Sequence, residues 1–148
     1  MSDPVAEMLN QNLDGWNRSM GLRFVRASAD EVVAEVRVDD RHRQPYGLVH
    51  GGVYASAVET TCSVGAALHA LPSGRNTVGL ENNTSFLHGT RDGTLTITAR
   101  PLSRGTRTQV WEATVTDDTG RACAIGRVRL LCLDPGAAVA GQTVKLQP

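Results

Sequence analysis

Apolar and polar residues alternate along much of this chain, and this period of two is typical of strands with one buried face. The clearest case is the run of Val32, Ala34, Val36 and Val38, whose intervening positions include Glu35 and Arg37. On this basis and on the turn residues between them, strands are expected around 22–28, around 32–38, from about 78 to 87, around 95–99, around 111–115 and over 121–133. The turn at 117–120 predicts a hairpin between the last two.

The N-terminus has a different pattern, which predicts a short helix. Asp3 precedes Pro4, and proline suits the first position of a helix because its missing N–H would be unpaired there anyway. Apolar residues then recur at helical spacing as far as Leu13. We expect this helix to end near Gly15 or Gly21, where glycine favours a break.

The middle of the chain is unusually poor in charge. Residues 44–74 contain one formally charged side chain, Glu59, and the stretch from 50 to about 69 has no proline and many small residues. A helix on the surface would carry more charge, so we expect a helix that is buried on most sides. A sheet that curls around it would supply this cover, which predicts an α+β domain.

The domain organisation follows from these elements. The 148 residues are enough for a single core. We expect an N-terminal helix in residues 1–20, one domain over 21–133 and a tail over 134–148. The tail begins at Asp134-Pro135-Gly136, which should stop the last strand, and is expected to be loosely held.

Charge and cysteine content exclude several classes of protein. Lysine plus arginine and aspartate plus glutamate number 15 each, and this zero net charge argues against partners such as nucleic acid or an anionic membrane. Three cysteines with no CxxC pair argue against a disulfide framework and favour a reducing compartment. With no signal-peptide pattern and no apolar run of 18 residues, a cytoplasmic protein is expected.

Glu59 is the residue that most needs explaining. A carboxylate on an apolar helix is costly unless it has partners, so Glu59 is a candidate general base or nucleophile. The alternative is an ion pair with an arginine across an interface, and the sequence leaves both open. Ser63 lies four residues later on the same helix face and could orient a water, although such a serine usually bonds back to its own turn.

The start of the same helix offers a second chemical element. The N–H groups of Gly51 and Gly52 lie at the positive end of the helix dipole and could polarise a carbonyl group, or the glycines could simply permit a tight turn. Gly51 and Glu59 are eight residues apart, about 12 Å along the axis and roughly 80° apart in direction. They can act on one carbonyl only from two chains, which predicts a two-fold dimer with antiparallel helices.

Other candidates are weaker. The four histidines, His42, His50, His69 and His88, lack metal-ligand spacing, so no metal site is expected. Neither a nucleophile elbow nor the Lys-Ser/Thr of a nucleotide-binding loop is present. The turn at 104–108 is basic and rich in hydroxyls, so it could hold phosphates or simply be solvated.

These residues together resemble the hotdog-fold acyl-CoA thioesterases of the PaaI type. The resemblance rests on Gln44-Pro45-Tyr46-Gly47-Leu48-Val49-His50-Gly51-Gly52 with Glu59 and Ser63, on residues 78–83 and on residues 107–112, and it covers about 21–133. It is closest to the glutamate-using branch, which includes 4-hydroxybenzoyl-CoA thioesterases and 1,4-dihydroxy-2-naphthoyl-CoA hydrolases. The resemblance implies a long helix wrapped by an antiparallel sheet of about six strands. It also implies a homodimer, often a homotetramer, with sites at the dimer interface and no cofactor beyond the coenzyme A of the substrate.

The resemblance also implies roles for individual residues. Glu59 would be the nucleophile or general base, and Ser63 would position water or the acyl group. Gly51 N–H would polarise the thioester carbonyl, helped by Gln44 and supported by His50. The substrate site would be lined by Gly79, Phe86, Leu87, His88 and Gly89, and the pantetheine and phosphates would be held by Ser103, Arg104, Gly105, Thr106, Arg107 and Thr108.

Two positions depart from the family pattern, and two other functions remain. The family often has arginine where His88 stands and proline or serine where Gly89 stands, so the binding of one phosphate could shift to Arg104 and Arg107.

An acyl-thioester hydratase or dehydratase would use a closely spaced His–Asp or His–Glu pair, and the sequence fits this pattern less well. A non-catalytic acyl-CoA sensor would need a DNA-binding domain, and the residues before Gly21 are too few for one. Aryl, phenylacetyl and medium-chain acyl groups all remain open.

Overall fold

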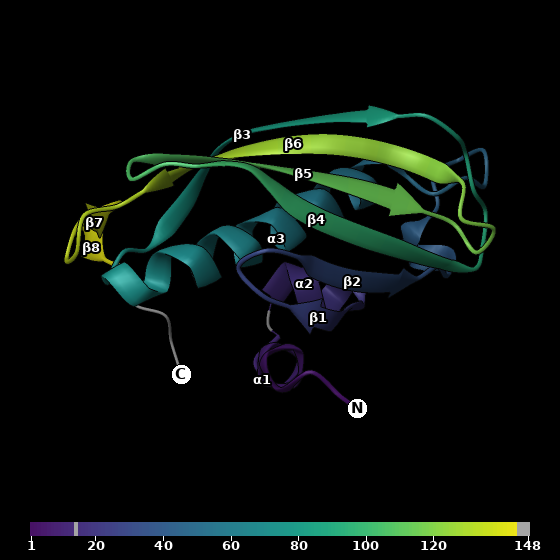
Figure 1. Ribbon diagram of the computed structural model, residues 1–148. Coiled ribbons are helices and arrows are strands. Elements are labelled where there is room, and N and C mark those ends of the chain that lie inside the picture. Colours follow the sequence, from purple (N-terminus) through teal and green to yellow (C-terminus); the bar gives the residue numbers. More distant parts are fainter. Residues whose placement is uncertain (14, 145–148) are drawn as a thin grey trace.

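A six-stranded antiparallel sheet curls over one long helix in the computed structural model, which describes residues 1–13 and 15–144 (Figure 1). The helix is α3 (Gly51–Ala70). The strands are β1 (Leu22–Ala27), β2 (Val32–Arg37), β3 (Thr77–Phe86), β4 (Thr94–Arg104), β5 (Thr108–Thr116) and β6 (Ala122–Cys132), in the order β1-β2-β4-β5-β6-β3. Two short 3₁₀ turns, Asp40–His42 and Leu71–Ser73, flank the region of α3. The predicted α+β class is confirmed.

The alternation in the sequence corresponds to the two faces of the sheet. In β5, Trp111, Ala113 and Val115 are fully buried against the helix while the residues between them are partly exposed. The turn before β6 closes as expected, since Asp117 N–H donates to Arg121 O at 3.0 Å and Gly120 takes a φ of +80°. Burial of one face of each strand is what fixes the register, because a slip of one residue would turn the apolar set outward.

The N-terminal segment forms two helices rather than the single one expected. These are α1 (Pro4–Gln11) and α2 (Gly15–Met20), which lie beside β1 (Figure 1). Gly15 has a φ of +53°, a left-handed conformation through which a right-handed helix does not continue. Asp3 caps α1 by accepting the N–H of Ala6, and its second oxygen accepts the N–H of Ala27 in β1 at 3.1 Å. These donors hold the pKa of Asp3 below its usual value.

A tight contact between Gly65 and Trp111 sets the distance between α3 and the sheet. A Cβ atom on Gly65 would lie 2.4 Å from the Trp111 ring. Trp111 is fully buried, and its indole N–H donates to Gln109 Oε1 at 2.9 Å. Gln109 in turn donates to Ala66 O at 3.0 Å, so the buried polar groups at this contact are paired.

This contact predicts that Gly65→Ala lowers the free energy of unfolding by about 1–3 kcal/mol, because the methyl group overpacks the core. The sign is opposite to that of an ordinary helical glycine, for which alanine stabilises by about 1 kcal/mol. Urea unfolding followed by circular dichroism measures the difference. In a Trp111→Leu background the same substitution should be neutral or stabilising, and an equal loss in both backgrounds would contradict the proposed clash.

The expectation that α3 is buried on most sides is confirmed, but one face of the helix is less covered than the others. Residues 55, 56, 59, 60, 63, 64, 67 and 68 form a half-buried stripe along one face of the helix. The sheet covers the other faces, whereas α2 only partly covers this one, where Thr60 Oγ1 donates to Asn17 Oδ1 at 2.7 Å. Glu59 is therefore half-buried, and its helix face is available to another surface.

The tail is more ordered than expected over the part that the structure describes. Residues 138–143 form a small hairpin of β7 (Ala138–Val139) and β8 (Gln142–Thr143), and Asn76 Nδ2 donates to Val144 O at 3.1 Å. Residues 145–148 of the predicted tail lie outside the described residues.

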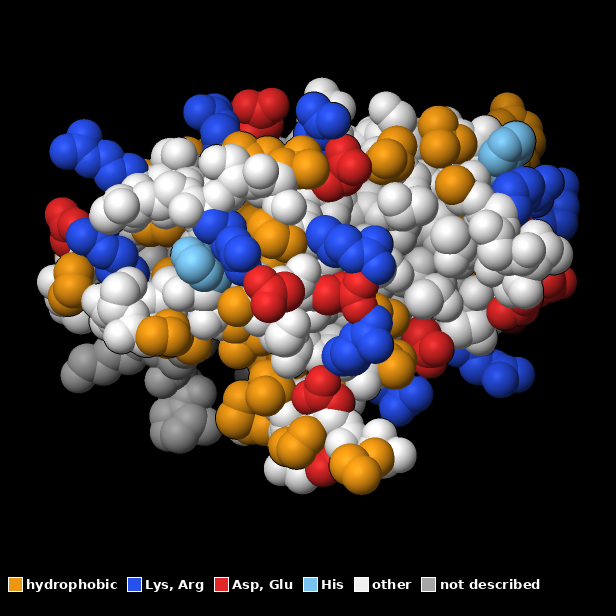
Figure 2. Space-filling model, in the orientation of Figure 1, with side chains coloured by type: hydrophobic (Ala, Val, Ile, Leu, Met, Phe, Trp, Pro, Cys, Tyr) orange, Lys and Arg blue, Asp and Glu red, His pale blue; other side chains and the backbone are white. Residues whose placement is uncertain are grey.

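No helix within residues 1–13 and 15–144 combines the length and the apolar character needed to cross a membrane. Charged side chains of both signs are interspersed over the face in Figure 2, in keeping with the zero net charge.

Candidate active site

His42 anchors the loop that leads into α3. It is 2% exposed, and its Nδ1 accepts the Asp39 N–H at 2.9 Å, so the ring proton lies on Nε2 and is donated to Met20 O at 2.7 Å. The backbone of His42 then accepts the N–H of His50 at 2.8 Å. His42 is thus a structural residue that fixes where the central helix begins.

The first turn of α3 presents one free backbone donor. His50 is the N-cap, and its Nδ1 accepts the Gly52 N–H at 2.8 Å, while its carbonyl accepts the Val53 N–H at 2.9 Å. Among the residues that the structure describes, none accepts the N–H of Gly51. This donor lies at the positive end of the helix dipole, where it can stabilise negative charge developing on an oxygen.

The free donor opens into a hollow of about 270 Å³, here called the helix-start pocket. It is lined by Gln44, Leu48, Val49, Gly51, Tyr54, Phe86, Leu87, His88 and Gly89. Five residues predicted from the sequence therefore come together around Gly51, namely Gln44, Phe86, Leu87, His88 and Gly89. Gln44 is held in a turn in which Gly47 takes a φ of +78° and donates its N–H to Gln44 O at 2.8 Å.

Glu59 lies in a different hollow, also of about 270 Å³, here called the Glu59 pocket. Its lining consists of Asn17, Glu59, Thr60, Ser63, Val64, Ala67 and Thr77, so Glu59 and Ser63 share a pocket as their spacing predicts. Oε2 of Glu59 accepts a hydrogen bond from Asn82 Nδ2 at 3.0 Å. Gly79 leaves room for the carboxylate, since a Cβ atom there would lie 2.6 Å from Glu59 Oε1.

The helix-start pocket and the Glu59 pocket have no lining residue in common. Gly51 and Glu59 are eight positions apart on α3, which corresponds to about 12 Å along the axis. A single chain therefore presents a carbonyl-polarising donor and a carboxylate at two separate places on one helix.

A third hollow of about 210 Å³ lies at the end of α3 and contains part of the predicted phosphate-binding turn. Arg104, Gly105 and Thr106 line it, whereas Ser103, Arg107 and Thr108 do not. The Arg104 guanidinium is already engaged, with Asp30 Oδ1 at 2.7 Å and Ala29 O at 2.8 Å. Arg75, which sequence reasoning missed, also lines this hollow and pairs with Asp134 at 2.8 Å.

Two more residues were missed from the sequence, Tyr54, which lines the helix-start pocket, and Asn82, which donates to Glu59. Tyr54 is 3% exposed, its ring centroid lies 6.0 Å from that of Phe86, and its hydroxyl has no hydrogen bond of normal geometry within the described residues. Burial raises the pKa of Tyr54 to about 12, so the hydroxyl stays protonated. Asn82 could have been noticed, because it places an amide where the alternation of β3 calls for an inward-facing apolar residue.

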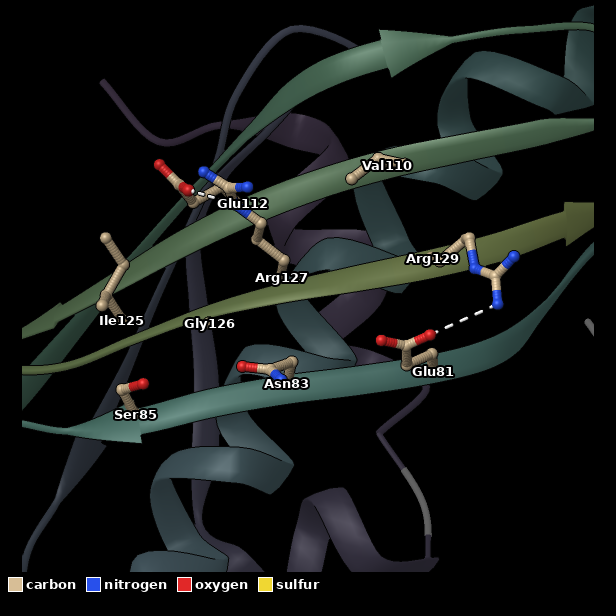
Figure 3. Close-up of a pocket in the computed structure, with 9 residues that line it drawn as sticks. All are labelled: Glu81, Asn83, Ser85, Val110, Glu112, Ile125, Gly126, Arg127 and Arg129. Atoms are coloured by element: carbon tan, nitrogen blue, oxygen red, sulfur yellow. Dashed lines mark hydrogen bonds and ion pairs between the residues drawn. The ribbon is translucent and has the colours of Figure 1, made fainter.

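A larger hollow, of about 510 Å³, is on the outer face of the sheet and contains none of the predicted site residues (Figure 3). Two ion pairs cross it between strands, Arg127 with Glu112 at 2.8 Å and Arg129 with Glu81 at 3.3 Å. The volume of a hollow therefore does not identify the site in this protein. The site is identified by the positions of Glu59 and Gly51 on α3. Over residues 1–13 and 15–144, no cluster of His, Cys, Asp or Glu suited to a metal ion is found.

Comparison with known proteins agrees with this architecture. The family model described as the thioesterase superfamily matches residues 46–124, more than half of the chain. The chain belongs to the thioesterase superfamily. The matched segment includes α3 with Gly51 and Glu59 and all of β3, so most of the residues that line the two pockets lie within the family region, with Gln44 and Asn17 outside it.

Individual members of the superfamily are similar over most of their length. A 1,4-dihydroxy-2-naphthoyl-CoA hydrolase of Escherichia coli K12 is 34% identical over 109 residues, which cover 74% of this chain and 79% of the relative. A solved thioesterase of Haemophilus influenzae is 31% identical with a TM-score of 0.82, covering 87% of this chain and 90% of that one. A mutant thioesterase of Pseudomonas aeruginosa is 31% identical with a TM-score of 0.83, covering 88% and 94%. The predicted hotdog fold and thioesterase class are confirmed.

Proposed function

We propose that this thioesterase-superfamily protein hydrolyses an acyl-CoA thioester to a free acid and coenzyme A, with Glu59 of one subunit and Gly51 of a second subunit in each site. The observation that carries the proposal is the pair of groups on α3. One is a half-exposed carboxylate in a pocket, and the other is a free N–H at the helix start. Each is half of what a thioester hydrolase needs, and a second copy supplies the other half.

The edge strand β3 supports this pairing. It is ten residues long, pairs only with β6, and leaves its other side without a strand partner among the described residues. Leu80, Phe86 and Leu87 are exposed at 48%, 59% and 49% along or next to this edge. A long edge with exposed apolar side chains is suited to pairing with another chain, and we take that chain to be a second copy.

The contacts of β3 with α3 indicate which parts of the two helices such a pairing of β3 strands would bring together. Gly79 lies against Glu59, whereas Phe86 lies against Gly51. Asn82, about midway between Gly79 and Phe86, donates to the carbonyl of Ala55, which is midway between Gly51 and Glu59. A two-fold axis near this point would exchange the two ends, so that Gly51 of one subunit approaches Glu59 of the other. The homotetramer implied by the resemblance would be a pair of such dimers.

The chemistry then follows from the two groups. Gly51 N–H, with Gln44 nearby, would donate to the thioester carbonyl oxygen and stabilise the negative charge that develops on it. Glu59 would either take a proton from the attacking water or attack the carbonyl carbon itself to give an anhydride that water then opens. In both routes the C–S bond breaks and the sulfur leaves and takes a proton to become the free thiol of coenzyme A.

The substrate class rests on the turn 103–108 and on the relatives. This turn would hold the pantetheine and phosphates. Arg104 in it is paired with Asp30, and Arg107 is not part of that ion pair. The hydrolase of Escherichia coli carries an aryl-CoA name, which supports an aryl acyl group for this chain. His88 at the helix-start pocket would face the thioester end of such a substrate. We place this activity in the cytoplasm.

The test is the release of free thiol from a panel of aryl-, arylacetyl- and alkyl-CoA substrates, followed with a thiol-reactive chromophore. Hydrolysis with a preference for aryl-CoA is the expected result. A hydratase would change the absorbance of an enoyl-CoA without thiol release, and a sensor would bind acyl-CoA without turnover. Light scattering on the same sample should give a mass of at least twice 15.8 kDa, and an active monomer would contradict the two-subunit site.

A further inference from the structure

We propose that Asn82 is the positioning residue for Glu59, fixing which oxygen of the carboxylate faces the substrate; this rests on the proposed role of Glu59 in thioester hydrolysis. Asn82 stands on β3 opposite Val128 of β6, and Val128 is fully buried against the helix layer. An apolar residue is expected at such a position. The amide there instead reaches across to α3.

Both hydrogens of the Asn82 amide are committed to α3. Nδ2 donates to Glu59 Oε2 at 3.0 Å and to Ala55 O at 2.9 Å. Because a carbonyl oxygen can only accept, the atom facing Ala55 must be the nitrogen, which settles the orientation of the amide. The Glu59 oxygen bound to the same nitrogen is therefore an acceptor.

The other end of the amide is also fixed. Thr84 Oγ1 donates to Asn82 Oδ1 at 2.6 Å, so a neighbouring side chain on the same inward face of β3 holds the amide in place. Asn82 is only half-buried, and this bond limits its rotation. Thr84, Asn82 and Glu59 thus form one chain of hydrogen bonds from the sheet to the helix.

The consequence is a carboxylate with two unlike oxygens. Oε2 is bound to Asn82, whereas Oε1 lies over the bare Cα of Gly79 and, within residues 1–13 and 15–144, accepts no hydrogen bond. Oε1 is therefore the oxygen that is free to take a proton from water or to attack the thioester carbon. Ordering the carboxylate in advance avoids the loss of activity that comes with a catalytic group slightly out of place.

The test uses purified full-length protein and a thiol-release assay across pH. Asn82→Leu removes the donors, and kcat should fall about 10- to 100-fold while KM stays within about threefold, as expected for a group that acts on the reacting carboxylate rather than on substrate binding. Asn82→Asp keeps the volume and the bond from Thr84 but faces Glu59 with a second carboxylate. It should move the acid limb of kcat/KM upward by about one pH unit or more.

Asn83 provides the matched control. It is the next residue on β3, but its side chain lies on the outer face of the sheet, among the residues of Figure 3. Asn83→Asp adds the same charge one residue away, and the acid limb should stay within about 0.2 pH units of wild type because the sheet separates it from Glu59. A purely structural effect of charge on β3 would instead move the profile in both variants.

The outcomes separate the positioning role from the proposed function. If Glu59→Gln keeps full activity, the proposed function fails. If Glu59→Gln is inactive while both Asn82 variants keep the wild-type kcat and pH profile, only the positioning role is overturned. Circular dichroism and light scattering check fold and assembly. If the Asn82 variants do not fold, Thr84→Val releases the amide with little change of shape, and its kcat should fall about three- to tenfold; an unchanged kcat would overturn the role.

Discussion

Replacing Glu59 with glutamine lowers kcat for thioester hydrolysis by about a thousandfold or more, with little change in KM, if the carboxylate is the base or nucleophile. Glutamine has nearly the same volume, but at neutral pH it cannot accept a proton and is a poor nucleophile. General-base catalysis alone contributes about 10²- to 10⁴-fold, and loss of a nucleophile costs at least as much. The half-buried position of Glu59 suits this substitution, because the residue is not part of the packed core.

The measurement is steady-state thiol release with the best substrate of the panel, on protein whose mass and circular dichroism match wild type. Glu112→Gln is the control, since Glu112 lies on the outer face of the sheet, where it pairs with Arg127. It removes the same charge and should change kcat by less than about twofold, as is usual for an exposed ion pair. A Glu59→Gln enzyme with more than about a tenth of the wild-type kcat would not be compatible with either role.

Removing the N–H of Gly51 should have the second largest effect. Gly51→Pro deletes this donor at the first helical position, where proline is tolerated, and His50 already has the extended conformation that precedes proline (φ −64°, ψ 137°). Loss of one such donor costs about 10²- to 10³-fold in kcat. Steady-state kinetics of thiol release measures the change.

Gly51→Ala is the matched control for this substitution. Alanine and proline both add a Cβ atom, which would lie 2.7 Å from the exposed Phe86 ring and push it aside, but alanine keeps the N–H. The difference in kcat between the two variants therefore isolates the hydrogen bond from the steric effect. Equal kcat values for the two would exclude Gly51 N–H as the group that polarises the carbonyl.

Combining the two inactive chains tests whether each site uses two subunits. In a dimer of one Glu59→Gln chain and one Gly51→Pro chain, one site keeps both groups and the other has neither. With random pairing after co-expression, half of the dimers are mixed, and each mixed dimer has one working site out of two. The mixture should therefore have about one quarter of the wild-type activity per chain. If each chain carried a whole site, the mixture would stay as inactive as its components.

Local sequence signals were sufficient for most elements because they depend on short-range physics. Alternation placed the six strands, and the Asp3-Pro4 start of α1 followed from capping. The sequence left the end of α1 open between Gly15 and Gly21 and did not predict the second helix, because whether Gly15 adopts a positive φ depends on how both helices pack beside β1. The hairpin of residues 138–143 was missed for a similar reason, since strands of two residues have no detectable period.

The site was predictable where it depends on spacing along one helix. Ser63 shares the Glu59 pocket because it is four residues on, and Gln44 and residues 86–89 were assigned by the family motif. Asn82 and Gly79 were not linked to Glu59 in their present roles. Their relation to the carboxylate depends on how β3 crosses α3, about twenty residues away in the chain.

The sequence by itself determined the classes of element, the family, and the separation of Gly51 from Glu59, because a helix fixes distances between its own residues. Only the tertiary structure decided that Glu59 is half-buried on an open face of α3, and that β3 is the edge strand with Glu59 near one end and Gly51 near the other. It also decided that Asn82 holds one carboxylate oxygen and leaves the other free. These features arise from contacts between segments distant in the chain, which the periodicity of a single segment does not record.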